Sequence, residues 1–205
     1  SRDWAAKGVR LAGVEAIVHL AGRAHVSRGR AGAAERAHAE AAVEGALRLG
    51  EAALAAGERR LVYVSSIHVH GPFSSGAPIT EHAPIRPQTP YAQGKWAAEE
   101  ALRALRGHGL APVVVRPVLV CGPGVKGNLL RLLRWVARGW PLPLRSVRNA
   151  RSLVGVDTLC GLLLDCATRP EAAGEVFLAA DEPALSTPEL VRTLARAMGS
   201  PERLL

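Results

Sequence analysis

Short apolar runs alternate with longer segments of helical periodicity along most of this 205-residue chain. Within the runs, apolar residues do not alternate with polar ones, which is the pattern of strands buried on both faces of a sheet. The runs are residues 16–20, 61–65, 113–117, 153–156 and 176–179. Because parallel strands need a crossover between them, this alternation predicts an α/β fold with a parallel sheet covered by helices.

The segments between the runs carry helix signals. One of them follows Pro90, a residue favoured in the first turn of a helix. The last segment begins either with a capping box from Ser186 to Glu189 or with a Thr187 cap followed by proline. The predicted helices are residues 35–56, 91–108, 128–138 and 157–168, together with a final helix after Ser186.

Two stretches show neither the apolar runs of strands nor the spacing of helices. Residues 23–34 are rich in Arg, Gly and Ala, and residues 71–90 contain five prolines together with Ser and Gly. Loops that leave the carboxyl ends of parallel strands hold ligands in open α/β sheets, so the second stretch is a candidate rim of an active site. A solvated connection explains the same composition equally well.

The net charge of +8 does not by itself indicate a nucleic-acid partner. All but three of the 26 basic residues are arginines, and they are scattered among alanines rather than clustered. The residues that most suggest such a partner are Arg28, Arg30, Arg59 and Arg60. Because no aromatic platform accompanies them, we expect no nucleic-acid binding.

The cysteines and the apolar stretches indicate the cellular compartment in which the protein is expected. Cys121, Cys160 and Cys166 form no CxxC pair, which favours a reducing cytoplasm over a disulfide framework and predicts no metal site. Residues 153–167 form the most apolar stretch, but two aspartates interrupt it, and it is shorter than the roughly 18–20 residues of a membrane span. We therefore expect a cytoplasmic protein without a membrane segment.

Tyr91-Ala-Gln-Gly-Lys95, at the start of a predicted helix, is the sharpest candidate for catalysis. A spacing of four places both side chains on one helix face, where an ammonium near the phenol would lower the tyrosine pKa from about 10. Tyr91 would then act as a general base near neutral pH. An exposed helix pair has the same spacing, but this chain uses arginine at nearly every other basic position, and lysine is the cation whose pKa changes readily.

A serine pair adds to this candidate. Ser65 and Ser66 follow Leu-Val-Tyr-Val, where a buried strand is expected to end. Hydroxyl groups at such a position can bind a substrate oxygen, although a strand-end turn or a helix cap explains a serine pair as well. With Tyr91 about 25 residues later, the serines form a Ser/Tyr/Lys set from two adjacent strand–helix units.

Several further motifs occur in order along the chain. They are Val-His-Leu-Ala-Gly at 18–22, Val-Ser-Ser at 64–66, Pro-Tyr-Ala-Gln-Gly-Lys at 90–95, Arg-Pro at 116–117, Gly-Pro-Gly at 122–124, Lys-Gly-Asn at 126–128, Pro-Leu-Pro-Leu at 141–144 and Arg-Ser-Leu-Val-Gly-Val-Asp at 151–157. With these motifs the chain resembles the extended short-chain dehydrogenase/reductases, in their NAD-dependent epimerase/dehydratase branch. It is similar to bacterial UDP-sugar 4-epimerases and 4-keto-sugar reductases over nearly its whole length.

The resemblance implies a Rossmann-like, doubly wound parallel sheet that is truncated at its N-terminal side. Residues 1–120 would form a partial dinucleotide-binding domain with the Ser/Tyr/Lys site, and residues 121–205 mainly a small C-terminal substrate-binding lobe. The strand at 16–20 would match the family's fourth, so that on the order of 50 residues with the Gly-rich phosphate-binding turn would be absent in front of it. We expect such a chain to bind NAD weakly or not at all and to associate through the free edge of that strand. Equally, the sequence can be the ordered part of a longer enzyme.

The resemblance also implies roles for single residues. Ser66 would hydrogen-bond the sugar oxygen that is oxidised, Tyr91 would remove the proton of that hydroxyl, and Lys95 would bind the nicotinamide ribose while tuning Tyr91. Other positions matched to the cofactor NAD, with NADP as the alternative, are Leu20, Ala21, Gly22, Ser65, Pro117 and Val118.

The implied substrate is a nucleotide sugar, UDP-linked, and the implied oligomeric state is a homodimer. Asn128 and Arg151 match positions that hold the nucleotide diphosphate, a role that suits a bidentate arginine. Leu142 and Leu144 lie in the segment matched to the base.

The leading interpretation is NAD-dependent epimerisation of a nucleotide-activated sugar through a transient 4-keto intermediate, as in a UDP-glucose 4-epimerase. A 4-keto-sugar reductase is the nearest alternative, and a dehydratase ranks third because no motif marks an acid pair for removal of water. A non-catalytic Rossmann remnant that serves as an interaction module is the alternative from another class. Ala42, where the family often has Asn, favours the remnant, whereas the retained Ser66, Tyr91 and Lys95 favour the enzyme.

Overall fold

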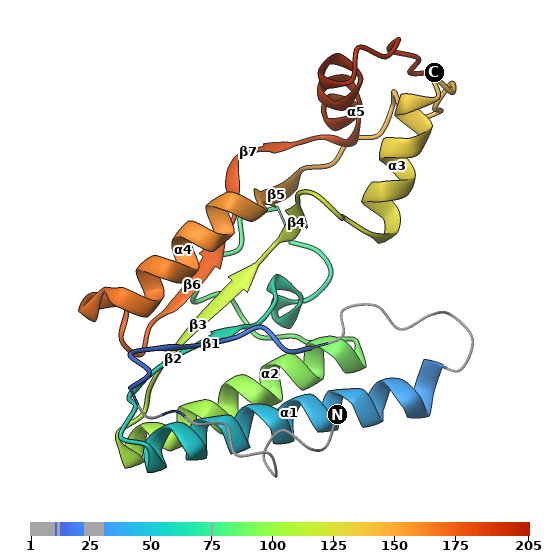
Figure 1. Ribbon diagram of the computed structural model, residues 1–205. Helices are drawn as coiled ribbons and strands as arrows, with labels where there is room; N and C mark the ends of the chain where they lie inside the picture. The colour runs from blue at the N-terminus through green and yellow to red at the C-terminus, as the bar shows by residue number, and fades with distance from the viewer. Residues whose placement is uncertain (1–10, 12, 23–30, 75) are drawn as a thin grey trace. The chain divides into compact units, whose positions relative to one another are not determined.

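The computed structural model describes residues 11, 13–22, 31–74 and 76–205, with the side chains of its first helix described from Glu35 onward. Strands and helices follow one another as the apolar runs predict (Figure 1). In chain order the elements are β1 (Ile17–His19), α1 (Ala31–Ala55), β2 (Arg60–Val64), η1 (Ile67–His70), α2 (Pro90–Ala104), η2 (Leu105–His108), β3 (Ala111–Pro117), β4 (Leu119–Cys121), α3 (Gly127–Ala137), β5 (Arg151–Gly155), α4 (Val156–Thr168), η3 (Pro170–Ala172), β6 (Val176–Ala179), β7 (Asp181–Leu185) and α5 (Thr187–Ala197).

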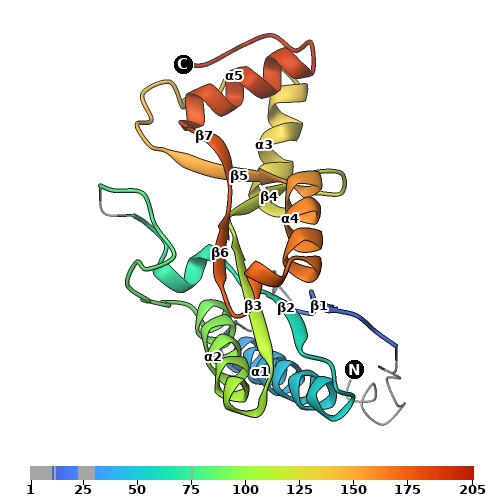
Figure 2. The same ribbon diagram turned by 90° about the vertical axis from the view of Figure 1, so that its left-hand side faces the viewer.

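The chain divides into two compact units, and the first unit holds the parallel sheet. This unit comprises Ser1–Val118 and Cys160–Ala179. Its four strands pair in the order β1-β2-β3-β6, all in parallel. Helices α1 and α2 lie side by side on one face of this sheet, and residues 160–168 of α4 lie on the other (Figure 2). The predicted doubly wound α/β fold is thus confirmed.

One core cluster joins the sheet to α1 and α2. Leu61 and Tyr63 are two residues apart on β2, so both side chains point to the same face of the sheet. They pack there with buried residues of the two helices, namely Ala46, Ala53, Ala98 and Leu102. The small side chains of the alanines allow the helices to lie close to the strands.

The two helices approach each other closely at Gly94. A Cβ atom at this position would lie 2.7 Å from the Cβ of Ala39 on α1, which is shorter than any real carbon contact. Gly94 therefore lets α2 settle against α1, and the next residue, Lys95, is buried against the sheet as a consequence.

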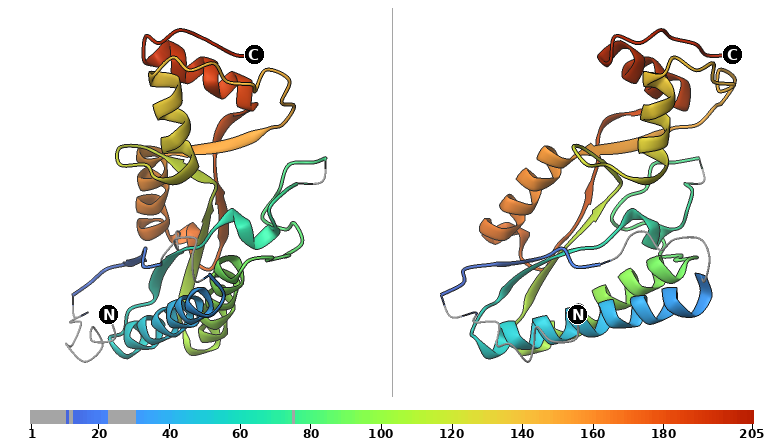
Figure 3. Two further views of the ribbon diagram at one scale, coloured as in Figure 1. Left: turned by 90° about the vertical axis from the view of Figure 1, so that its right-hand side faces the viewer. Right: turned by 45° about the vertical axis from the view of Figure 1, so that its right-hand side comes forward.

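The second unit comprises Leu119–Leu159 and Ala180–Leu205. Its three-stranded sheet has the order β4-β5-β7, in which β5 is parallel to β4 and antiparallel to β7. Helices α3 and α5, yellow and red in Figure 3, contact each other. Their shared core contains the buried residues Val136, Leu142, Val191 and Ala195.

The structure corrects the sequence-based boundaries in three places. Residues 160–179, assigned from the sequence to the C-terminal lobe, belong to the first unit because β6 pairs with β3. The stretch 23–34 was expected to be irregular; its residues 23–30 lie outside the described part of the chain, and 31–34 form the first turn of α1. Helix 91–108 is α2 followed by the 3₁₀ turn η2.

Two strands have no counterpart in the predicted pattern. β4 has three residues, too few for a recognisable run. β7 has the sequence Asp-Glu-Pro-Ala-Leu, whose acidic residues and proline are depleted in strands. It is an edge strand, where proline is tolerated because one row of N–H groups needs no partner.

Helix α5 confirms one of the two predicted caps. The Ser186 hydroxyl accepts a hydrogen bond from the backbone N–H of Glu189, and the Glu189 carboxylate accepts one from the backbone N–H of Ser186. This is a capping box. Among the described residues, no helix combines the length and the apolar character needed to cross a lipid bilayer.

Candidate active site

The Ser/Tyr/Lys set lies at the carboxyl edge of the parallel sheet in the first unit. Ser66 follows β2 and is the N-cap of η1, where its hydroxyl oxygen accepts a hydrogen bond from the backbone N–H of His68 at 3.3 Å. Tyr91 is the second residue of α2, which begins at Pro90 and is capped by the Thr89 hydroxyl. Lys95 lies one turn further along the same helix.

Ser66 lies close enough to Tyr91 to influence the pKa of the phenol. The Ser66 oxygen is the acceptor of the η1 cap, so its position is fixed by the backbone. Burial raises the pKa of Tyr91 above its ordinary value, and Ser66 acts in the opposite direction. The neutral phenol is therefore the favoured form in the protein without ligands.

Lys95 is almost completely buried, with 7% of its surface exposed. Its ammonium donates a hydrogen bond to the carbonyl oxygen of Val64 at 2.8 Å and lies 4.9 Å from the centre of the Tyr63 ring. Burial lowers the pKa of Lys95 to about 8, and the negative charge of Glu99 acts against this decrease. The lysine is thus a cation held in poor solvation, with a proton that is easily lost.

The expected lowering of the Tyr91 pKa by Lys95 does not occur in this structure. The pKa of Tyr91 is raised, and the opposing influence comes from Ser66. The physical reason is the direction of the lysine side chain, whose ammonium is bound to the end of β2. A shared helix face brings two side chains near each other, but burial of the phenol outweighs the cation here.

The two tyrosines of the chain provide a direct test of this correction. Burial raises the pKa of Tyr63 as well as that of Tyr91. We therefore expect no phenolate absorbance below about pH 10 in an ultraviolet titration without cofactor. The variant Tyr63→Phe assigns the remaining signal to Tyr91, and a Tyr91 midpoint near neutral pH would contradict the structure.

The segment after β1 lies beside the side chain of Lys95. Leu20, Ala21 and Gly22 are exposed, and a Cβ atom at Gly22 would lie 3.1 Å from the Nζ atom of Lys95. The absence of a side chain at Gly22 therefore leaves the ammonium accessible from this side. Among the described residues, the ammonium donates to Val64 alone, so a ligand with hydroxyl groups could accept its other two hydrogen bonds.

The other residues matched to the cofactor are engaged within the protein. The Ser65 hydroxyl donates a hydrogen bond to Glu99, and the Val118 backbone N–H donates one to the carbonyl oxygen of Ala179 at 3.0 Å. Pro117 is buried at the end of β3. Ser65 therefore supports the strand end that carries Ser66, and its hydroxyl is not directed to a ligand in this structure.

The residues matched to the substrate lie in the second unit. Asn128 is exposed near the start of α3 and accepts a hydrogen bond from Arg131, and Arg151 is exposed at the start of β5. Leu142 is buried in the core of this unit, with Leu144 packed against it. The side chain of Leu142 is therefore a packing residue.

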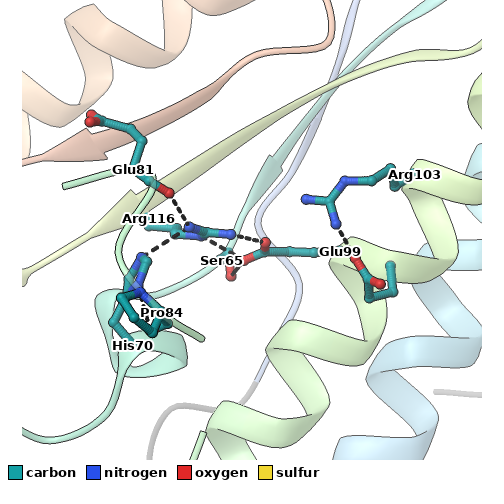
Figure 4. Close-up of polar contacts among 8 residues, drawn as sticks. Ser65, His70, Glu81, Pro84, Glu99, Arg103 and Arg116 are labelled. Carbon is teal, nitrogen blue, oxygen red and sulfur yellow. Dashed lines mark hydrogen bonds and ion pairs between the residues drawn. The ribbon is translucent and has the colours of Figure 1, made fainter. Parts of the chain in front are cut away.

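A buried polar cluster escaped the sequence analysis (Figure 4). It includes Ser65, the residue next to Ser66, and Glu99, one helical turn after Lys95. Glu99 and Arg116 form an ion pair, and the Arg116 guanidinium also contacts His70. The sequence held a signal for Glu99, because Tyr91, Lys95 and Glu99 follow one another at spacings of four on one helix face. Its partner comes from another strand, which no local spacing reveals.

Comparison with known proteins identifies the family. Residues 2–179 match the model of the NAD dependent epimerase/dehydratase family. The chain is 37% identical over 188 residues to a UDP-glucose 4-epimerase from Vibrio cholerae. The aligned region covers 90% of this chain and 57% of that protein.

Solved structures show the same relationship. A dTDP-glucose 4,6-dehydratase from Streptomyces venezuelae, solved with NAD and TYD bound, has a TM-score of 0.75 and 31% identity, covering 95% of this chain and 61% of that one. MoeE5 in complex with UDP-glucose and NAD has a TM-score of 0.76 and 26% identity. The match covers 95% of this chain and 66% of the MoeE5 chain. The chain thus spans less than two thirds of the length of these relatives. By its fold, its motifs and these matches, the chain belongs to the NAD-dependent epimerase/dehydratase family.

Proposed function

We propose that this protein takes part in the 4-epimerisation of a nucleotide-activated sugar, UDP-linked, with NAD as cofactor. The observation that carries the proposal is the placement of three side chains at one edge of the parallel sheet: Ser66 after β2, Tyr91 at the start of α2, and Lys95 with its buried ammonium bound to the end of β2. The 37% identity to a UDP-glucose 4-epimerase supports the choice of reaction and substrate.

Tyr91 and Ser66 would handle one sugar hydroxyl. The Tyr91 phenolate accepts the proton of that hydroxyl as its carbon is oxidised to a ketone, and it returns the proton when the ketone is reduced on its other face. Ser66 donates a hydrogen bond to the same oxygen throughout. The reaction has no net change in oxidation state, because bound NAD supplies first the hydride acceptor and then the hydride donor.

The described residues beside Lys95 fit part of that cofactor. The free donors of Lys95 suit the hydroxyl groups of a ribose, and the missing side chain at Gly22 leaves room for a ligand beside them. Leu20, Ala21, Pro117 and Val118 are the further residues that we assign to the cofactor. A bound ribose would keep Lys95 in its ammonium form, since hydrogen bonds to a charged group favour it.

The substrate, assembly and compartment are also proposals. Asn128 and Arg151 supply an amide and a guanidinium for a nucleotide diphosphate, and Leu142 and Leu144 contribute the backbone of the segment along the base. We propose a homodimer, as the family resemblance implies. The three cysteines are free thiols, which supports a reducing compartment such as the cytoplasm.

Dehydration is the second candidate function, because a dTDP-glucose 4,6-dehydratase is 31% identical to the chain. Removal of water from the intermediate requires an acid and a base besides the tyrosine. No motif in the sequence marks such a pair, which favours epimerisation over dehydration.

An assay with UDP-glucose and NAD tests the proposal and separates the alternatives. We expect UDP-galactose to form without net conversion of NAD to NADH. Net consumption of NADH with a 4-keto sugar nucleotide would indicate a reductase, and a product lighter by one water would indicate a dehydratase. If the protein converts none of these substrates yet binds a partner protein, the interaction-module alternative is correct.

A further inference from the structure

A buried ion pair lies behind the Ser/Tyr/Lys set. Glu99 on α2 is completely buried, and Arg116 on β3 is 2% exposed. The Nη2 atom of Arg116 lies 2.6 Å from Oε2 of Glu99, and its Nε atom donates to Oε1 at 3.1 Å. The guanidinium and the carboxylate therefore meet as two parallel hydrogen bonds, the strongest geometry for this pair.

This pair contacts the segments that carry the catalytic candidates (Figure 4). The Ser65 hydroxyl, next to Ser66, donates a hydrogen bond to Glu99. The remaining nitrogen of Arg116, Nη1, donates to Nε2 of His70 in η1 at 2.9 Å and to the carbonyl oxygen of Glu81 at 3.4 Å. Glu99 thus connects the end of β2 to helix α2, and the Arg116 guanidinium connects the turn η1 and the loop before α2 to the same carboxylate.

The tautomer of His70 follows from these contacts. Arginine has only donors, so Nε2 of His70 must accept. The proton of the neutral ring then lies on Nδ1, which faces the carbonyl oxygen of Pro84 at 3.3 Å. Burial and the charge of Arg116 lower the pKa of His70, which maintains this neutral form. The cluster therefore balances one cation against one anion.

Glu99 also influences the charge of Lys95, which precedes it by one helical turn. Burial lowers the pKa of Lys95, and Glu99 is the group that raises it. The other titratable groups around the ammonium are Tyr91 on the same helix, Tyr63 on β2 and His19 on β1. Burial raises the pKa of both tyrosines and lowers that of His19, so all three favour their neutral forms. The charged groups behind them are Glu99 and its ion-pair partner Arg116.

We propose that Glu99 and Arg116 are positioning residues of this site: Arg116 fixes the Glu99 carboxylate, which holds Ser65 at the end of β2, where the carbonyl oxygen of Val64 binds the Lys95 ammonium. This inference deepens the proposed function, since the ammonium matters for a ligand of Lys95. A purely structural role is a weaker explanation, because a buried ion pair costs desolvation energy and is often no more stable than an apolar pair.

Nuclear magnetic resonance of the lysine side chains tests the proposal without any assay of activity. The chain has three lysines, Lys7, Lys95 and Lys126, so a sample labelled with ¹³C at the lysine Cε gives three signals. The signal that disappears in Lys95→Met identifies Lys95. In the unaltered protein we expect this signal to titrate near a pKa of about 8.

In Glu99→Gln we expect the Lys95 midpoint to fall by about 1, because the carboxylate no longer opposes burial. The matched control is Glu100→Gln, which removes the neighbouring exposed carboxylate of the same helix and should leave the midpoint unchanged. If Glu99→Gln does not fold, Glu99→Leu with Arg116→Met removes both buried charges together and should lower the midpoint by less, because the cation leaves with the anion.

An unchanged Lys95 midpoint in a folded variant without Glu99 overturns the proposal. The same change in Glu100→Gln as in Glu99→Gln also overturns it, because the effect would then be one of general surface charge. Neither result depends on epimerase activity, so failure of this proposal is distinguishable from failure of the proposed function.

Discussion

Replacing Tyr91 by Phe should lower the kcat of the proposed epimerisation by roughly 10²–10⁴-fold, the usual contribution of a positioned general base. Phenylalanine keeps the aromatic ring and removes the phenol oxygen that Ser66 influences. Binding of the nucleotide sugar should change little, because the phenol contributes to proton transfer rather than to affinity. The measurement is UDP-galactose formation from UDP-glucose at saturating substrate, with binding followed by calorimetry.

Tyr63→Phe is the matched control for this result, since the chain has two tyrosines. The Tyr63 hydroxyl is buried and has no hydrogen-bond partner among the described residues. Its removal should leave turnover within about threefold and should not lower stability, because an unpaired buried hydroxyl costs free energy. Unchanged turnover in Tyr91→Phe would reject the role assigned to this residue.

Replacing Lys95 by Met should stabilise the protein near neutral pH while it abolishes the proposed activity. Burial lowers the pKa of Lys95 from 10.5 to about 8, a difference that corresponds to about 3 kcal/mol of unfavourable free energy for the charged form. Loss of the hydrogen bond to Val64 offsets about 1 kcal/mol of this gain. We expect a net increase of about 2 kcal/mol in the free energy of unfolding at about pH 7, measured by urea denaturation.

The pH dependence of this stabilisation has a defined sign. The folded pKa of Lys95 lies below its unfolded value, so the stability linked to this group is present above pH 10.5 and is lost as the pH falls through about 8. The advantage of Lys95→Met should therefore shrink as the pH rises from about 8 to 10.5. Lys126→Met, at an exposed lysine, should change stability by less than about 0.5 kcal/mol at any pH. A Lys95→Met protein that is less stable than the unaltered one at neutral pH would contradict the burial of a poorly solvated cation.

These two variants illustrate a cost of function. A buried ammonium is an expensive feature in a fold whose other core residues are mostly apolar, and it persists where a ligand needs a cation. Gly94 and the packing of α1 on α2 bring Lys95 into this position, and Glu99 compensates part of its desolvation. At position 95, an apolar residue therefore favours stability, whereas lysine is needed for the proposed chemistry.

Local patterns accounted for much of this structure. The apolar runs at 61–65 and 113–117 became neighbouring strands β2 and β3, because uninterrupted runs of this length suit strands covered on both faces. The cap at Ser186 and the start of α2 at Pro90 were readable because capping depends on residues within one turn. Placement of Ser66 and Tyr91 at one edge followed from the parallel order of the strands.

What the amino-acid sequence determined by itself was therefore the type and order of most elements and the identity of the Ser/Tyr/Lys set. Only the tertiary structure decided that the Lys95 ammonium binds the end of β2, that burial raises the pKa of Tyr91, and that Glu99 pairs with an arginine 17 residues away. The physical reason is range: periodicity and capping act within a few residues, whereas desolvation and ion pairing depend on side chains that folding brings together from separate strands and helices.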